Sequence, residues 1–364
     1  MADGQRAGTG QFGELVAQLL VRGDAGVRVE DDLLSHGPIV PHRRKRGGVR
    51  DAAAHTVHRM TVIVRDFRPS DAEAWTRARR ASVPWMVATP EQIVHDLTHA
   101  HPDKHYRLLV AEEDGEIIAT AQAGIAHESP EPGQGYFTPQ TLPGRTNRGA
   151  GSLLLRTAEE HLAGVGATVL YAWVLDNPES LEFARKRGYE PKRSAHFQRL
   201  DLAGGTLPPR QELPAGVELR TGADFADDPR ALFEADSEVT ADEPGDITSE
   251  LDDYEDWLTN VWRHPAFDQG LTSVALVDGK VAAFSAATTD GERTYLSAMT
   301  GTLREFRGRG LAKLAKNDSL HRARAAGYTD AYTSNDTGNG PMLAVNQWFG
   351  YQVCATEVRH VRTL

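Results

Sequence analysis

Arg307-Gly308-Arg309-Gly310-Leu311-Ala312 is the stretch that decides the fold of this 364-residue chain. It follows a β-rich run at residues 294–303 and begins an amphipathic helical pattern. The first N–H groups of a helix lack intrahelical acceptors, and the aligned peptide dipoles add about half a positive charge there. Two glycines let a bulky anion approach those amides. The stretch predicts a phosphate or diphosphate site, although an ordinary basic helix start stays open on six residues alone.

This stretch differs from two familiar phosphate loops. It has no terminal Gly-Lys-Ser/Thr, which excludes a Walker A loop, and it lacks the third glycine of a dinucleotide-binding fingerprint. It does match Arg/Gln-x-x-Gly-x-Gly/Ala, and so resembles the signature of the GNAT (GCN5-related) N-acetyltransferases. The resemblance implies acetyl-CoA as co-substrate, with residues 307–312 around its diphosphate.

The residues after the stretch continue the same resemblance. A helix is predicted to end at Ala326-Gly327, and a short strand follows at residues 330–334. An Asn-led helix then stops at Gly350-Tyr351 before a last strand at residues 352–361. This order is similar to the back half of a GNAT domain, and the resemblance covers residues 217–362.

The same pattern occurs earlier in the chain. Asn147-Arg148-Gly149-Ala150-Gly151 opens a helical segment, and Asn177 and Gly188-Tyr189 follow it, each 161 or 162 residues before its counterpart. Upstream of each loop, an Asp-Gly pair, Asp114-Gly115 or Asp278-Gly279, separates two alternating strands, as in a β-hairpin. The chain therefore reads as a tandem duplication of one α/β unit.

We expect an α/β (α+β) protein of two tandem GNAT-type domains, each a mixed, mainly antiparallel twisted sheet flanked by helices. The first domain is expected at residues 60–202 and the second at 214–364, joined by a breaker-rich linker at 203–213. Residues 1–59 are expected to be a disordered leader without function, and translation starting at Met60 is an open alternative.

Composition narrows the class of protein further. The net charge of −11 argues against general nucleic-acid binding. The chain contains one cysteine and no long apolar segment, which together favour a cytoplasmic protein without membrane contact. The histidines show no metal-ligand spacing, so we expect no metal. Oligomeric state is not determined by the sequence.

The resemblance also implies the rest of the cofactor site. A family member would carry the acetyl carbonyl and the pantetheine on the strand that contains Thr300, Gly301 and Thr302, with a kink at Gly301. Asn339 would reach the cofactor arm, although a helix cap explains it nearly as well. The first repeat offers a second set of phosphate-binding residues, which are Arg148, Gly149, Ala150 and Gly151.

The catalytic residues are less well defined. Many members of the family that the sequence resembles have a tyrosine that acts as general acid, seven residues after the asparagine that corresponds to Asn339. Here that position is Asn346, which cannot release a proton at neutral pH. The thiolate is then expected to leave with the help of water or of Asn346 alone, or another residue such as Tyr295 contributes. Acidic candidates for the base lie between the first two helices of the second repeat, namely Glu238, Asp242, Glu243 and Asp246, and Glu292 is a further one. A solvated acidic loop explains the first four equally well.

The two repeats differ in how well they keep the signature. Thr146 stands where the first repeat needs Arg or Gln, so we expect a catalytic second domain and a degenerate first that shapes the acceptor cleft. The predicted function is acetyl transfer from acetyl-CoA to a primary amine of a small molecule. Two alternatives stay open: an enzyme similar to mycothiol synthases, and a non-catalytic acyl-CoA-binding or scaffold protein.

Overall fold

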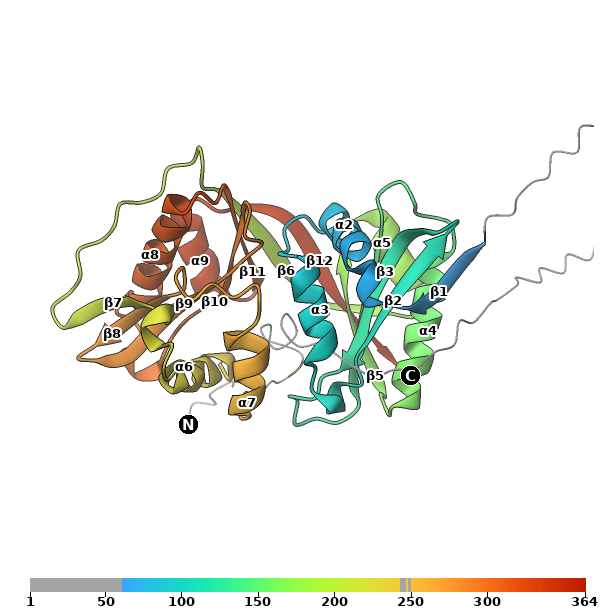
Figure 1. The fold of residues 1–364 in the computed structure, drawn as a ribbon, viewed down its shortest axis with the longest axis horizontal. Helices are drawn as coiled ribbons and strands as arrows, with labels where there is room; N and C mark the ends of the chain where they lie inside the picture. The colour runs from blue at the N-terminus through green and yellow to red at the C-terminus, as the bar shows by residue number, and fades with distance from the viewer. Residues whose placement is uncertain (1–60, 243–246, 248–249) are drawn as a thin grey trace, which may run out of the picture.

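The computed structural model describes residues 61–242, 247 and 250–364, whose strands form one 12-stranded sheet (Figure 1). Its strands are β1 (Val62–Asp66), β2 (Arg107–Glu113), β3 (Glu116–Ile125), β4 (Gln134–Thr141), β5 (Val169–Leu175), β6 (Glu190–Asp201), β7 (Val217–Thr221), β8 (Ser273–Val277), β9 (Lys280–Thr289), β10 (Thr294–Thr302), β11 (Asp330–Asp336) and β12 (Gln352–Thr363). Its helices are α2 (Ala72–Ser82), α3 (Pro90–Thr98), α4 (Ala150–Gly164), α5 (Pro178–Arg185), α6 (Arg230–Thr240), α7 (Tyr254–Trp257), α8 (Leu311–Ala325) and α9 (Gly340–Phe349).

Helices cover both faces of the sheet because its strands are apolar on both sides. Along β2, Leu109 packs in the cluster that contains α4, while its neighbour Leu108 packs in the cluster that contains α2. The second repeat behaves alike, with α8 on one face and α6 and α7 on the other. The expected mixed, mainly antiparallel sheet flanked by helices is confirmed, and its parallel pairs are β4·β5 and β10·β11.

The last strand of each repeat lies in the other repeat's half of the sheet. The strand order is β1-β2-β3-β4-β5-β12-β6-β11-β10-β9-β8-β7. β12 pairs with β5, β6 pairs with β11, and the two exchanged strands pair with each other at the centre. The sequence expectation, in which each repeat forms its own sheet, did not include this exchange. The segment 203–213, all of it described, contains no helix or strand.

The repeated hairpins form as their sequences require. Asp114 and Gly115 have φ of 51° and 83°, and Asp278 and Gly279 have φ of 50° and 79°. Two consecutive residues at positive φ are typical of the tight turns that Asp-Gly favours. Local turn chemistry therefore fixes the same hairpin, β2–β3 and β8–β9, in both repeats.

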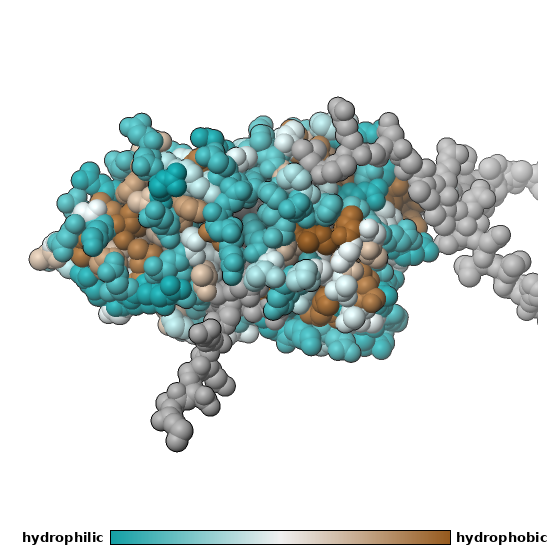
Figure 2. All heavy atoms as spheres, turned by 90° about the horizontal axis from the view of Figure 1, so that it is seen from below, coloured by the Kyte–Doolittle hydropathy of each residue, from teal (hydrophilic) through white to brown (hydrophobic). Residues whose placement is uncertain are grey.

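On the side drawn in Figure 2 most residues are hydrophilic, and apolar ones form separate patches. Among the helices of the described residues, none combines the length and the apolar composition that a membrane crossing requires.

Candidate active site between the two repeats

Each repeat contains a fork where two parallel strands diverge. β4 and β5 pair from Gln134↔Val169 to Tyr136↔Tyr171, and no pairing between them continues beyond that point. β10 and β11 pair from Thr294↔Asp330 to Leu296↔Tyr332 and then diverge in the same way. Backbone groups that face each other across such a fork lack ladder partners, so an extended polar ligand arm fits between them.

A helix begins close behind each fork. α4 follows Gly149 (φ 88°) and α8 follows Gly310 (φ 75°), and a Cβ atom at either glycine would meet nothing within 4 Å. The open space in front of each helix leaves the first-turn amides accessible to an anion.

Several basic side chains of the two loops already have acidic partners, whereas Arg309 lies over the Phe306 ring. Arg307 and Arg304 both bond Asp242, whose pKa is lowered chiefly by the Arg304 hydrogen bond. In the first repeat, Arg148 Nη1 lies 2.6 Å from Glu113 Oε2. A diphosphate at either helix would therefore have to share these arginines with a carboxylate.

The forks differ in one strand. β10 contains a β-bulge between Ser297 and Thr300, whereas the β3·β4 register runs without a shift. The predicted kink thus lies just before Gly301, and a Cβ at Gly301 would lie 2.2 Å from Val239 Cγ1 of α6. Glycine is needed there because the helix approaches the strand so closely. In the first repeat, β4 carries Pro139, which has no backbone N–H to donate.

Tyr295 and Asn346 both lie on the face of the sheet that α8 covers in the second repeat. Tyr295 is fully buried, with its Oη 2.6 Å from Ser319 Oγ on α8. Asn346 is also fully buried and accepts a hydrogen bond of 2.7 Å from Lys316 Nζ. It donates to Gln198 Oε1 and to Asn335 Oδ1. Burial lowers the pKa of Lys316 to about 7. Asn339 accepts from Met342 N at 3.3 Å, which is the helix cap.

The acidic candidates for the base lie apart from these residues. Glu238 Oε1 accepts a hydrogen bond of 2.6 Å from the Arg304 backbone N–H, beside Asp242 and the phosphate loop. Glu292 is exposed and lies 3.9 Å from Arg80. Glu243 and Asp246 lie outside the described residues. As placed here, Glu238 caps a turn of the loop that precedes α8.

A cavity of about 130 Å³ lies on the opposite face of the sheet and is lined by both repeats. It contacts residues at both forks and on their diverging strands, which are Tyr136, Thr138, Tyr171, Trp173, Leu296, Ala298 and Ser334. None of Glu238, Tyr295 and Asn346 lines this cavity. A cofactor arm that entered either fork from the face covered by α4 and α8 would end at this shared space.

Glu357 of β12 is the carboxyl group in this cavity best suited to accept a proton. It stands opposite Leu175 of β5, and burial raises its pKa to about 7, against the opposing effect of Arg79 and Arg359. An acid that is half ionised near neutral pH suits proton transfer. Sequence reasoning missed Glu357 because only the strand exchange brings β12 to the fork of the first repeat.

Further charged and polar side chains line the cavity. Arg359 lies 5.0 Å from the ring centroids of both Tyr171 and Trp173. Asp96 Oδ1 of α3 lies 3.0 Å from Nε2 of His264, which belongs to the second repeat. The wall of the cavity is therefore aromatic and charged, and the two repeats are joined across it.

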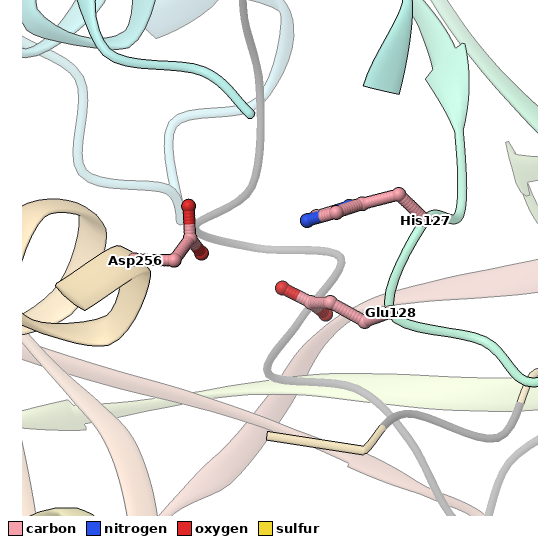
Figure 3. A group of neighbouring side chains, drawn as sticks. All are labelled: His127, Glu128 and Asp256. Atoms are coloured by element: carbon pink, nitrogen blue, oxygen red, sulfur yellow. The ribbon is translucent and has the colours of Figure 1, made fainter. Parts of the chain in front are cut away.

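A second group of side chains connects the repeats. His127 and Glu128 point toward Asp256, and one ligand atom of each lies within 4.8 Å of the others (Figure 3). Burial lowers the pKa of His127 to about 3, so its imidazole is neutral. The buried Lys104 interacts electrostatically with both carboxylates. Burial lowers the pKa of Lys104, against the opposing effect of Glu128 and Asp256, and the group forms a polar contact between the repeats.

Comparison with protein families and curated proteins finds acetyltransferases. Residues 66–189 match the model of the acetyltransferase (GNAT) family. A mycothiol acetyltransferase from Geodermatophilus obscurus is 37% identical over 112 residues, which cover 29% of this chain and 36% of that protein. One from Thermomonospora curvata is 27% identical over 257 residues, covering 70% of this chain and 82% of that protein.

Solved structures with similar folds include tandem proteins. A GCN5-related N-acetyltransferase from Sphaerobacter thermophilus has a TM-score of 0.62 at 21% identity, covering 83% of this chain and 95% of that one. A tandem GNAT protein from the clavulanic acid biosynthesis pathway has a TM-score of 0.64 at 20% identity, covering 83% of this chain and 98% of that one. At these identities the likeness concerns the fold.

Proposed function

We propose that this chain, residues 66–189 of which match the model of the GNAT acetyltransferase family, transfers an acetyl group from acetyl-CoA to the primary amine of a small molecule bound in the cavity between the repeats. The observation that carries the proposal is the position of this cavity. It meets both forks and contains Glu357, whose pKa is raised to about 7. The single cysteine supports placing the reaction in the cytoplasm.

The proposed donor site is the fork of the second repeat, with the diphosphate at the N-terminus of α8. The free space at Gly310 supports this assignment, because the anion can approach the helix amides closely. The β10 bulge adds support, since its extra residue frees a backbone N–H for the thioester oxygen. Pro139 removes such a donor from β4.

In the proposed step, the Glu357 carboxylate takes a proton from the acceptor ammonium. The free amine attacks the acetyl carbonyl carbon, a C–N bond forms, and the C–S bond of the thioester breaks. The thiolate of CoA leaves, and the second proton of the amine passes to it or to solvent. Holding amine and thioester in one cavity removes the entropic cost of bringing them together.

Specific observations favour three other readings. The names of the two curated relatives support an acceptor related to mycothiol, which would be its deacetylated amine. The match of the family model to residues 66–189 supports a donor site in the first repeat. A non-catalytic acyl-CoA-binding protein is the third reading, which the absence of the family's tyrosine at Asn346 favours.

A pair of matched variants tests the proposal. Gly310→Glu and Gly149→Glu place the same side chain, at similar positive φ and in similarly open space, before α8 and α4. We expect Gly310→Glu to weaken acetyl-CoA binding, measured by calorimetry, at least about 100-fold through crowding and charge repulsion. CoA release with a panel of amines should fall with it. The panel includes deacetylated mycothiol.

Each outcome of this experiment has a definite meaning. Loss of binding only in Gly149→Glu would move the donor site to the first repeat. If acetyl-CoA binds but CoA is released with none of the amines in the panel, the non-catalytic reading is favoured. No acetyl-CoA binding by the parent protein would overturn the proposed function.

A further inference from the structure

Arg79 of α2 lines the cavity and makes few of the hydrogen bonds that its guanidinium group could make. A guanidinium carries five N–H donors. Among the residues that the structure describes, the one hydrogen bond of this side chain runs from Nη1 to Gln140 Oε1 at 3.4 Å. Its guanidinium carbon lies 5.3 Å from the Trp75 ring centroid. The cost of its partial desolvation is visible in its pKa, which burial lowers.

Nearby acidic groups do not satisfy this guanidinium. Asp96 is bonded to His264 at 3.0 Å. Glu357 interacts electrostatically with Arg79, but the two side chains form no hydrogen bond or ion pair. The cavity thus holds a cation and an acid close enough to influence each other's charge and too far apart to pair. A ligand with one charge of each sign would complete both.

We infer that the acceptor is a compact zwitterion, a primary amine that also carries a carboxylate, as an α-amino acid does. Its ammonium lies at Glu357 and its carboxylate at Arg79. A carboxylate matches the fork of a guanidinium with two parallel hydrogen bonds. The inference rests on the proposed function, since it names the acceptor class of the same site.

The size of the cavity agrees with such a ligand. A cavity needs on the order of 10–15 Å³ to hold one water molecule, so the 130 Å³ of this cavity hold about ten water-sized groups. A small or medium α-amino acid has a comparable number of non-hydrogen atoms. The rings of Trp75, Tyr171 and Trp173 line the same space and favour an apolar or aromatic side chain on the ligand.

The experiment compares α-amino acids with their matching primary amides, which keep the amine and the side chain but lose the carboxylate charge. Acetyl-CoA is held at saturation and CoA release is followed. We expect kcat/KM to be about 10- to 100-fold higher for the acids, because a charge-assisted hydrogen bond to a desolvated group is lost in the amides.

Variants of Arg79 assign the effect to this residue. Arg79→Met should raise KM for the acids about 10- to 100-fold, with little change in kcat or in the rates with amides. Arg79→Lys keeps the charge and should recover part of the loss, which also guards against a Met variant that folds poorly. Arg77→Met, an exposed residue of the same helix, is the matched control and should change neither substrate class.

The outcomes separate this inference from the function beneath it. A preference for acids that disappears in Arg79→Met supports it. Acetylation of α-amino acids and their primary amides at equal rates, or a preference for the acids that survives Arg79→Met, would overturn the zwitterion while leaving the acetyltransferase intact. Failure to release CoA with every amine, alongside failure to bind acetyl-CoA, would remove the proposed function itself.

Discussion

In the first repeat, Leu155 of α4 and Ala184 of α5 are buried in an apolar core, whereas the matching positions of the second repeat hold Lys316 and Asn346. Those two side chains are joined by a hydrogen bond of 2.7 Å at full burial. Helix order, hairpins and forks are nonetheless the same in both. The fold therefore forms with either apolar or polar side chains at these two positions. The polar pair of the second repeat needs an explanation other than folding.

The second difference lies in the forks. The second repeat has the bulged strand, and the first has an unbulged strand with Pro139. Glu357, however, belongs by sequence to the second repeat and lies by structure in the first repeat's half of the sheet. In the proposed function the two repeats therefore supply complementary parts of one site, which the strand exchange brings together.

The largest effect should come from removing β12. Deletion of residues 352–364 takes away a strand that pairs with β5 on one side and β6 on the other. We expect both repeats to lose cooperative unfolding, seen as loss of the thermal transition by circular dichroism, because β5 and β6 would both become unpaired edges in the middle of the sheet. Deleting only the exposed Leu364 is the control. A first repeat that stays folded without β12 would show that the exchange is dispensable.

Glu357→Gln tests the shared site at the level of chemistry. The substitution keeps the shape and removes the base, so kcat/KM should fall about 100-fold. In the parent, kcat/KM should rise with pH through about 7, where Glu357 ionises, and then level off. The variant should show no such rise. An unchanged profile in Glu357→Gln would remove this residue from the proposed mechanism.

Glu357→Gln should lower kcat/KM but raise the stability of the folded chain above pH 7. The pKa of Glu357 is raised in the folded chain, from 4.5 to about 7, so the folded state binds more protons between these values and stability falls as pH rises through them. Gln cannot ionise. Glu357→Gln should therefore melt at a higher temperature than the parent at pH 8 and at nearly the same temperature near pH 4.5. A merely damaged structure would melt lower at both.

Local features of both repeats were predictable because neighbouring residues determine them. The Asp-Gly turns need two residues at positive φ, and the start of α8 needs a glycine cap, and both are readable in the sequence. Gly301 is different, because a Cβ there would clash with Val239 of α6, so packing between elements and not the neighbouring residues requires glycine at that position.

The exchange and the cavity were not predictable in the same way. Antiparallel ladders are made of backbone hydrogen bonds, so the sequences of β6 and β12 do not state which partner each takes. Glu357 and Arg79 are far apart in the chain, and each is one charged residue among many until the exchange brings them to one space. Asn346 was chosen by family spacing and Tyr295 as an alternative donor, and the placement of both on the α8 side of the sheet depends on packing against that helix.

The smallest effect sharpens the comparison most. The double substitution Lys316→Leu and Asn346→Ala gives the second repeat the residue types of the first. The pKa of Lys316 is lowered from 10.5 to about 7 by burial, so above pH 7 the unfolded chain binds more protons and stability rises with pH, by at most about 1.4 kcal/mol per pH unit. The double variant should lose this slope between pH 7 and 9 in urea unfolding.

Activity of the same double variant decides why the polar pair is present. If the pair only fills space, acetyl transfer should be unchanged while stability at pH 7 rises, because an isolated buried ammonium costs more than it contributes. If the pair lines the path of the cofactor arm, as the family spacing of Asn346 implies, acetyl-CoA binding should weaken about tenfold despite the gain in stability. Lys316→Leu alone is the matched control, since it leaves the Asn346 bonds to Gln198 and Asn335 in place. Equal stability slopes in parent and variant would mean that Lys316 stays charged in the folded chain, and the contrast with Leu155 would then be one of shape and not of charge.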